Sequence, residues 1–218
     1  MVDHQHWLDR WREDRIGFHE ASVNRHLQHW FPKYAGSGGS RVFVPLCGKA
    51  LDMLWIARQG FEVLGVELSE IAIEAFFEEN QLDCRQSQQG PFRVYETDGI
   101  RLLQGDFFDL DAADLTGCEL IYDRAALIAL EAEDRPAYYD HMLAIMPTAC
   151  KMLLITLDYD PAEMRGPPFS VPTEEVMRHY QNAFRIETLA TENIVDKGPR
   201  WRKVGLTALE ESVFGLVR

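Results

Sequence analysis

Short apolar runs alternate with segments of helical periodicity over most of the chain. The helical segments repeat apolar positions every three or four residues, whereas the apolar runs between them show no polar alternation. Uninterrupted apolar runs are typical of strands buried on both faces of a parallel sheet. The runs lie at 41–46, 61–68, 118–123 and 151–159, and the helical segments at 49–60, 69–79 and 134–146. This order predicts a doubly wound α/β fold with a mainly parallel sheet and right-handed crossovers.

Three regions depart from this alternation. Residues 92–105 predict two strands joined at Asp98-Gly99, a dipeptide that favours tight turns, and so form a hairpin insertion. Two helices precede the first strand, at 3–12 and 21–30, and a glycine- and serine-rich connector follows at 34–40. The C-terminal part predicts a proline-rich loop at 158–172, a helix at 173–183, a strand at 184–192, a loop containing 197–201 and a final strand from 204. We expect one domain over 1–218, in which a helical cap (1–35) precedes the α/β core (41–218).

Composition narrows the classes of partner. The chain has 218 residues, 46% of them hydrophobic, which suffices for one full core but is short for two domains. Its formal net charge of −13 disfavours nucleic acid, because such binding relies on clustered Lys and Arg. The four cysteines show no metal-binding or disulfide spacing, and no apolar run resembles a signal peptide or membrane span. We therefore expect a metal-free cytoplasmic monomer that acts on a small molecule, without a nucleic-acid or membrane partner.

Candidate binding residues follow three of the predicted strands. In a doubly wound sheet, ligands bind beyond the C-terminal strand ends, and here the first such turn is PLCGK. Gly48 allows close backbone approach to a ligand, but the GxGxxG of a pyrophosphate site is missing. Glu67 ends the second strand, where a carboxylate can bind both ribose hydroxyls, and Asp106 with Phe107 can contact adenine. Ribose and adenine contacts without a pyrophosphate cradle favour S-adenosylmethionine over NAD.

Further motifs occur in a fixed order along the chain. VFVPLCGKALDMLWIARQGFEVLGVELSE is preceded by WLDRWREDRIGFHE and followed by GDFFDL, YDRAAL, LDYDPAEMRGPPFSVP and RWRKVGL. From about Trp7 to the C-terminal strand, the chain resembles the bacterial type of the thiopurine S-methyltransferase family. The resemblance implies a Rossmann-like methyltransferase fold with a seven-stranded type of sheet, S-adenosylmethionine as methyl donor, S-adenosylhomocysteine as product and aromatic or heterocyclic thiols such as thiopurines as acceptors. It also implies cofactor binding by Trp11, Phe18, Leu46, Gly48, Glu67, Asp106, Phe107 and Arg124, and an acceptor contact at Arg200.

The implied chemistry makes modest demands on the protein. Methyl transfer from a sulfonium to a thiolate is an in-line displacement, in which positioning contributes most of the rate. Aromatic thiols are partly ionised near neutral pH, so no strong general base is required. Guanidinium groups stay protonated, so Arg124 and Arg200 are candidate catalytic residues as electrostatic stabilisers of the thiolate. Apolar walls of the acceptor site are expected from Phe18, Phe31 and Phe169.

Three alternatives differ in the acceptor or in catalysis. One is a methyltransferase for selenium or tellurium species, or for another small-metabolite acceptor. The second is a nicotinamide-dependent dehydrogenase, which the missing GxGxxG disfavours. The third is a non-catalytic module that binds S-adenosylmethionine, since fold alone does not fix function. His19 is the one histidine considered as a proton relay, and packing is its favoured role.

Overall fold

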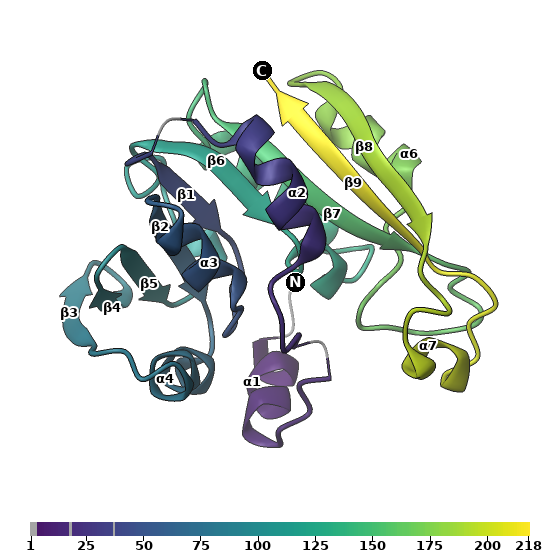
Figure 1. Ribbon diagram of the computed structural model, residues 1–218, viewed down its shortest axis with the longest axis horizontal. Coiled ribbons are helices and arrows are strands. Elements are labelled where there is room, and N and C mark those ends of the chain that lie inside the picture. The colour runs from purple at the N-terminus through teal and green to yellow at the C-terminus, as the bar shows by residue number, and fades with distance from the viewer. Residues whose placement is uncertain (1–3, 18, 37) are drawn as a thin grey trace.

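A nine-stranded sheet forms the centre of the computed structural model, which describes residues 4–17, 19–36 and 38–218 (Figure 1). The strand order is β3-β4-β5-β2-β1-β6-β7-β9-β8. All the apolar runs predicted as strands lie in this sheet. The strands are β1 (Arg41–Val44), β2 (Glu62–Glu67), β3 (Arg85–Gln89), β4 (Phe92–Thr97), β5 (Ile100–Gln104), β6 (Cys118–Asp123), β7 (Lys151–Asp158), β8 (Arg185–Asn193) and β9 (Glu210–Val217).

The central strands β5-β2-β1-β6-β7 pair in parallel, and antiparallel strands flank them on both sides. This arrangement confirms the predicted doubly wound α/β fold. β4 and β5 form the predicted hairpin, in which Thr97 pairs with Ile100 across the turn. The sheet also has a strand that the sequence did not indicate, because β3 consists of exposed polar residues that pair with β4. An edge strand exposed on both faces has no apolar alternation from which it can be predicted.

Helices cover both faces of the sheet. Successive side chains of β1 separate the two cores, because strand side chains alternate between faces. Val42 and Val44 pack with one set of helices and Phe43 with the other. The first set consists of α2 (Arg25–Tyr34), α3 (Asp52–Arg58) and α4 (Glu70–Glu79), and the second of α5 (Arg135–Ile145) and α6 (Thr173–Tyr180).

No helix in the described part of the chain is long and apolar enough to span a membrane.

Two further helices, α1 (His4–Arg12) and α7 (Pro199–Lys203), lie at the end of the sheet where the parallel strands finish (Figure 1). The loop predicted around 197–201 was therefore wrong in part, since α7 begins there at a proline. Proline is well accommodated at a helix start, where its missing N–H has no partner to lose.

Caps and burial explain other helix boundaries. The Ser69 side chain accepts a hydrogen bond from the Ala72 N–H and so caps the start of α4. α2 continues through Pro32 to Tyr34, beyond the predicted end at Trp30. Phe31 and Tyr34 are buried against the sheet, and this tertiary packing outweighs the helix-breaking tendency of the proline.

Candidate active site

A cavity of about 360 Å³ opens at the C-terminal ends of the parallel strands, and residues of α1 and α7 contribute to its walls. Its size and mixed apolar and charged lining are typical of a small-molecule site. Phe18, a predicted cofactor residue, lies outside the described residues. The other predicted site residues all line the cavity, namely Trp11, Leu46, Gly48, Glu67, Asp106, Phe107, Arg124 and Arg200.

The turn after β1 adopts a left-handed backbone conformation at the cavity wall. Leu46 has a φ of 45° and Gly48 a φ of 52°. Such a φ is rare for leucine, and strained backbone of this kind clusters at functional sites. The Gly48 N–H donates to Glu67 Oε2 at 2.9 Å, and the Ser69 N–H donates to Glu67 Oε1 at 2.8 Å. One carboxylate therefore joins the PLCGK turn to the end of β2.

The buried Glu67 carboxylate retains capacity for a ligand. Burial raises its pKa above the ordinary value, although the N–H groups of Ser69 and Gly48 oppose this shift. Each oxygen of a carboxylate offers about two acceptor positions, and the backbone occupies one on each. Glu67 can therefore accept hydrogen bonds from two further donors, such as neighbouring hydroxyl groups.

Asp106 and Phe107 combine a carboxylate with an aromatic wall. Asp106 Oδ1 accepts the Phe108 N–H at 2.9 Å, while Oδ2 lies 3.3 Å from His4 Nε2 of α1. The Phe107 ring is buried and stacks on Tyr138 of α5, with ring centroids 4.8 Å apart. A carboxylate beside stacked rings can bind the amino edge and the face of a purine.

Trp11 of α1 covers the PLCGK turn after β1. Its side chain is buried, and a Cβ added to Gly48 would lie 3.2 Å from Trp11 Cζ2. Glycine at position 48 is therefore favoured by its positive φ and by the nearby indole ring. α1 therefore lies over this turn.

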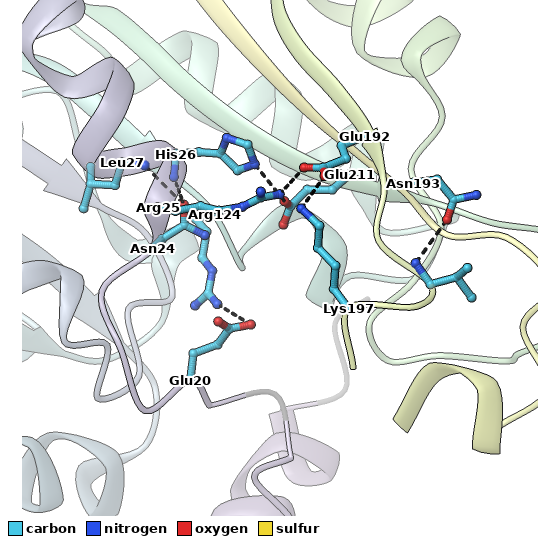
Figure 2. Close-up of polar contacts among 11 residues, drawn as sticks. Glu20, Asn24, Arg25, His26, Leu27, Arg124, Glu192, Asn193, Lys197 and Glu211 are labelled. Atoms are coloured by element: carbon cyan, nitrogen blue, oxygen red, sulfur yellow. Dashed lines mark hydrogen bonds and ion pairs between the residues drawn. The ribbon is translucent and has the colours of Figure 1, made fainter. Parts of the chain in front are cut away.

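Two arginines meet a glutamate at another wall of the cavity. Arg124, directly after β6, lies 3.0 Å from Glu20 Oε1 (Figure 2). Arg200 of α7 donates to the Gly17 carbonyl at 2.6 Å, and its second nitrogen lies 3.9 Å from the same Glu20 oxygen. These contacts hold the segment after α1 against the ends of β6 and α7.

The two guanidinium groups have opposite pKa shifts. Burial acts against the charge of Arg124, but the neighbouring Tyr122, Asp52 and Glu20 outweigh it and raise the pKa. For Arg200, burial lowers the pKa, and the nearby Arg124 lowers it further. Both groups stay cationic at neutral pH because a guanidinium begins from so high a pKa.

Apolar side chains from loops and strand ends surround this charged wall. The prediction of Phe31 as a wall of the acceptor site was wrong. Phe31 faces the sheet and packs on Trp55 and Phe61, with centroids 5.4 and 4.9 Å away. Phe169 is not among the described lining residues, although its backbone N–H donates to the Ile128 carbonyl at 2.6 Å and so anchors the proline-rich loop. The apolar lining includes Ile128, Leu157, Met164, Pro167, Pro168, Ile194, Trp201 and Val204.

Sequence reasoning missed two carboxylates of the cavity, Glu20 and Glu211. Glu20 lies in an irregular segment and Glu211 near the start of a strand, so neither belongs to a local motif. His19 also lines the cavity, where burial and then the charge of Lys49 lower its pKa. Its imidazole is therefore neutral at physiological pH, and packing stays the predicted role.

The fold is the Rossmann-like fold that several methyltransferases of known structure share. The chain resembles an S-adenosylmethionine-dependent methyltransferase from Anabaena variabilis with a TM-score of 0.66 and 13% identity, covering 100% of this chain and 96% of that one. It resembles the 1,6-didemethyltoxoflavin-N1-methyltransferase of Burkholderia thailandensis with a TM-score of 0.64 and 13% identity, covering 99% and 87%. At such identities the likeness establishes the fold alone.

Sequence similarity narrows the class to one family. The family model described as thiopurine S-methyltransferase matches residues 2–218. A thiopurine S-methyltransferase of Nitrosospira multiformis is 47% identical over 213 residues, which cover 98% of this chain and 97% of the relative. One from Pseudomonas fluorescens is 48% identical over 208 residues, 95% of each chain. The chain belongs to the thiopurine S-methyltransferase family, which confirms the resemblance.

Proposed function

We propose that this protein transfers the methyl group of S-adenosylmethionine to the sulfur of aromatic or heterocyclic thiols such as thiopurines. One observation carries the proposal: a single cavity holds the Glu67 carboxylate beside the turn after β1 and, at another wall, the cations of Arg124 and Arg200. Family membership supports the same reaction, since relatives of 47% and 48% identity are named thiopurine S-methyltransferase.

The residues that would hold the cofactor fit its chemistry. S-adenosylmethionine, when bound, supplies an activated methyl group on a sulfonium and leaves as S-adenosylhomocysteine. Glu67 has the acceptor capacity for two ribose hydroxyls, and Asp106 with Phe107 offers a polar edge and an apolar face for adenine. Further cofactor contacts are proposed for Trp11, Leu46, Gly48 and Arg124, and for Phe18 outside the described residues.

Arg124 and Arg200 act on the acceptor through charge and orientation. A guanidinium cannot serve as a base, but it lowers the free energy of a nearby thiolate relative to the thiol. Much of the cavity lining is apolar, and charge interactions are stronger beside apolar walls than in bulk solvent. The acceptor sulfur is thus kept ionised and pointed at the methyl group without a dedicated catalytic base.

We further propose that the chain acts as a single-domain monomer in the cytoplasm, without a nucleic-acid partner. The formal net charge of −13 supports the last point, because like charge repels a phosphate backbone. Size-exclusion chromatography with light scattering measures the oligomeric state directly.

Transfer of labelled methyl groups from S-adenosylmethionine tests the function. The acceptors are 6-mercaptopurine and thiophenol, with phenol and aniline as oxygen and nitrogen controls, and Glu67→Ala serves as the variant deficient in cofactor binding. Replacing Arg124 and Arg200 together by Met should lower kcat/KM for thiols roughly a hundredfold, as losses of electrostatic stabilisers do. Arg202→Met is the matched control, since Arg202 pairs with Asp196 at 2.8 Å and is not among the described lining residues.

Thiol-selective turnover that is lost in Glu67→Ala is the expected result. Full activity of the double arginine variant would contradict the role given to the two cations. Absence of transfer to any thiol by the unaltered protein would refute the proposed function.

A further inference from the structure

Glu211 is a carboxylate of the cavity wall that the proposed reaction does not use. It lies near the start of β9, opposite Leu157 of β7, and its side chain is only 15% exposed. Burial alone raises its pKa, but hydrogen bonds from His26 and Arg25 outweigh burial and leave the pKa below its ordinary value. Glu211 is therefore ionised at neutral pH within a largely apolar surrounding.

The hydrogen bonds that Glu211 accepts both end on the same oxygen. His26 Nε2 lies 2.8 Å and Arg25 Nη2 lies 3.1 Å from Glu211 Oε2 (Figure 2). Within the described part of the chain, Oε1 has no hydrogen-bond partner, and the Glu211 side chain is partly exposed at the cavity wall. Because an ionised carboxylate can only accept hydrogen bonds, a molecule that meets Oε1 must bring a donor.

The charged groups of Glu20, Arg124 and Arg200 pair with one another, unlike the Oε1 atom of Glu211. Glu20, the second carboxylate missed by sequence analysis, directs Oε1 toward Arg124 and Arg200 and partly neutralises them. Glu211 lies near enough to Arg124 to contribute to the rise in its pKa. The cavity thus offers cations for an anionic sulfur and, from β9, a separate acceptor oxygen for the rest of the molecule.

We propose that Glu211 is a specificity-determining residue that accepts a hydrogen bond from a ring N–H or amino group of the acceptor, while Arg124 and Arg200 hold its sulfur. The inference rests on the proposed function and adds a second recognition element to it. A thiopurine keeps a ring N–H when its sulfur is ionised, whereas thiophenol then has no donor. Glu211 therefore favours N–H-bearing heterocyclic thiols over benzene thiols.

Glu211→Gln alters the proposed hydrogen-bond acceptor with little change in the shape of the side chain. Arg25 and His26 both donate to position 211, so they orient the amide oxygen toward themselves and leave the NH₂ group facing the cavity. A donor then replaces the acceptor that the ring N–H requires. Glu211→Asp keeps the charge opposite Arg25 and His26 but shortens the reach into the cavity, and it provides a second variant.

Glu192→Gln is the matched control. Glu192 Oε2 accepts from the same Arg25 Nη2 at 2.6 Å and also pairs with Lys197, as Figure 2 shows. It is not among the described lining residues of the cavity. This variant therefore removes a charge from the same Arg25 cluster without altering the proposed recognition element.

The experiment measures Kd for 6-mercaptopurine and for thiophenol in the presence of S-adenosylhomocysteine, together with kcat/KM for both thiols. Glu211→Gln should weaken 6-mercaptopurine about tenfold or more, as loss of a hydrogen bond to a charged group does, and leave thiophenol within about twofold. Glu211→Asp should show a smaller selective loss, and Glu192→Gln should change neither ligand. Retained thiophenol binding shows that a variant is folded.

An equal effect on both thiols, no effect on either, or failure of the unaltered protein to bind 6-mercaptopurine would overturn the inference. Binding is measured apart from turnover, so the proposed function is judged separately. If both thiols bind and no methyl group is transferred, the proposed function fails, while the Kd values still decide the role of Glu211.

Discussion

Asp123, the last residue of β6, makes the stability of the fold depend on pH in a predictable direction. Its side chain is fully buried, and it accepts hydrogen bonds from Tyr138 Oη at 2.6 Å and from the Leu127 N–H at 3.3 Å. Burial raises the pKa of Asp123 to about 6 from the usual 3.8, although these hydrogen bonds oppose it. The folded protein therefore holds this proton more tightly than the unfolded chain does.

The direction and size of this pH dependence follow from the difference between the pKa values of Asp123 in the folded and unfolded states. The stabilising contribution of protonated Asp123 is complete below pH 3.8 and is lost as the pH rises through about 6. The difference between these two pKa values corresponds to about 3 kcal/mol over the full range, of which roughly 1 to 2 kcal/mol is lost between pH 5 and pH 8. Asp123→Asn removes the titration while keeping a side chain of the same shape.

Urea unfolding of the two proteins at pH 5 and pH 8 measures this term. The free energy of unfolding of Asp123→Asn minus that of the unaltered protein should be lower at pH 5 than at pH 8, by roughly 1 to 2 kcal/mol. Asp83→Asn, at an exposed position, controls for the change in net charge. An equal stability difference between Asp123→Asn and the unaltered protein at both pH values would show that folding does not raise the pKa of Asp123.

Three further substitutions probe the packing and the cofactor side of the cavity. Gly215→Ala should lower the free energy of unfolding by about 1 to 3 kcal/mol, because the added Cβ would overlap the buried Tyr34 hydroxyl; unchanged thermal stability would contradict this packing. Glu175→Gln breaks a buried ion pair in which Arg135 Nε and Nη2 donate to Glu175 at 2.6 and 2.8 Å. The free energy of unfolding in urea should fall by about 3 kcal/mol, and an unchanged value would show that the pair is solvated. Trp11→Ala should weaken S-adenosylmethionine about tenfold in calorimetry on the folded variant, and equal affinity would remove Trp11 from the proposed cofactor site.

The parts of the fold with a strong apolar pattern were predictable from the sequence. Strands β1, β2, β6 and β7 are buried on both faces, so their residues form uninterrupted apolar runs. β3 was missed because its exposed residues RQSQQ owe their conformation to pairing with β4 and not to their own pattern. The end of α2 was missed for a similar reason, since burial of Tyr34 holds a helix that Pro32 would otherwise end.

The candidate site likewise contains residues that the sequence predicted and residues that it did not. Glu67 was identified because a carboxylate at the C-terminal end of a parallel strand is placed to bind a ligand, and the structure places it against the Gly48 N–H. Glu20 and Glu211 were missed because they reach the cavity through tertiary folding from segments that have no motif of their own. Phe31 was assigned wrongly because sequence spacing does not tell which face of α2 meets the sheet and which meets a ligand.

The central claim is that one cavity holds the methyl donor at Glu67 and the acceptor sulfur at Arg124 and Arg200. A crystal structure of the protein with S-adenosylhomocysteine and 6-mercaptopurine tests it most directly. We expect ribose hydroxyls hydrogen-bonded to Glu67 and the thiopurine sulfur directed toward both arginines and in line with the cofactor sulfur. An adenosine bound away from Glu67, or a thiopurine bound outside this cavity, would show that the donor and acceptor sites are not the ones proposed.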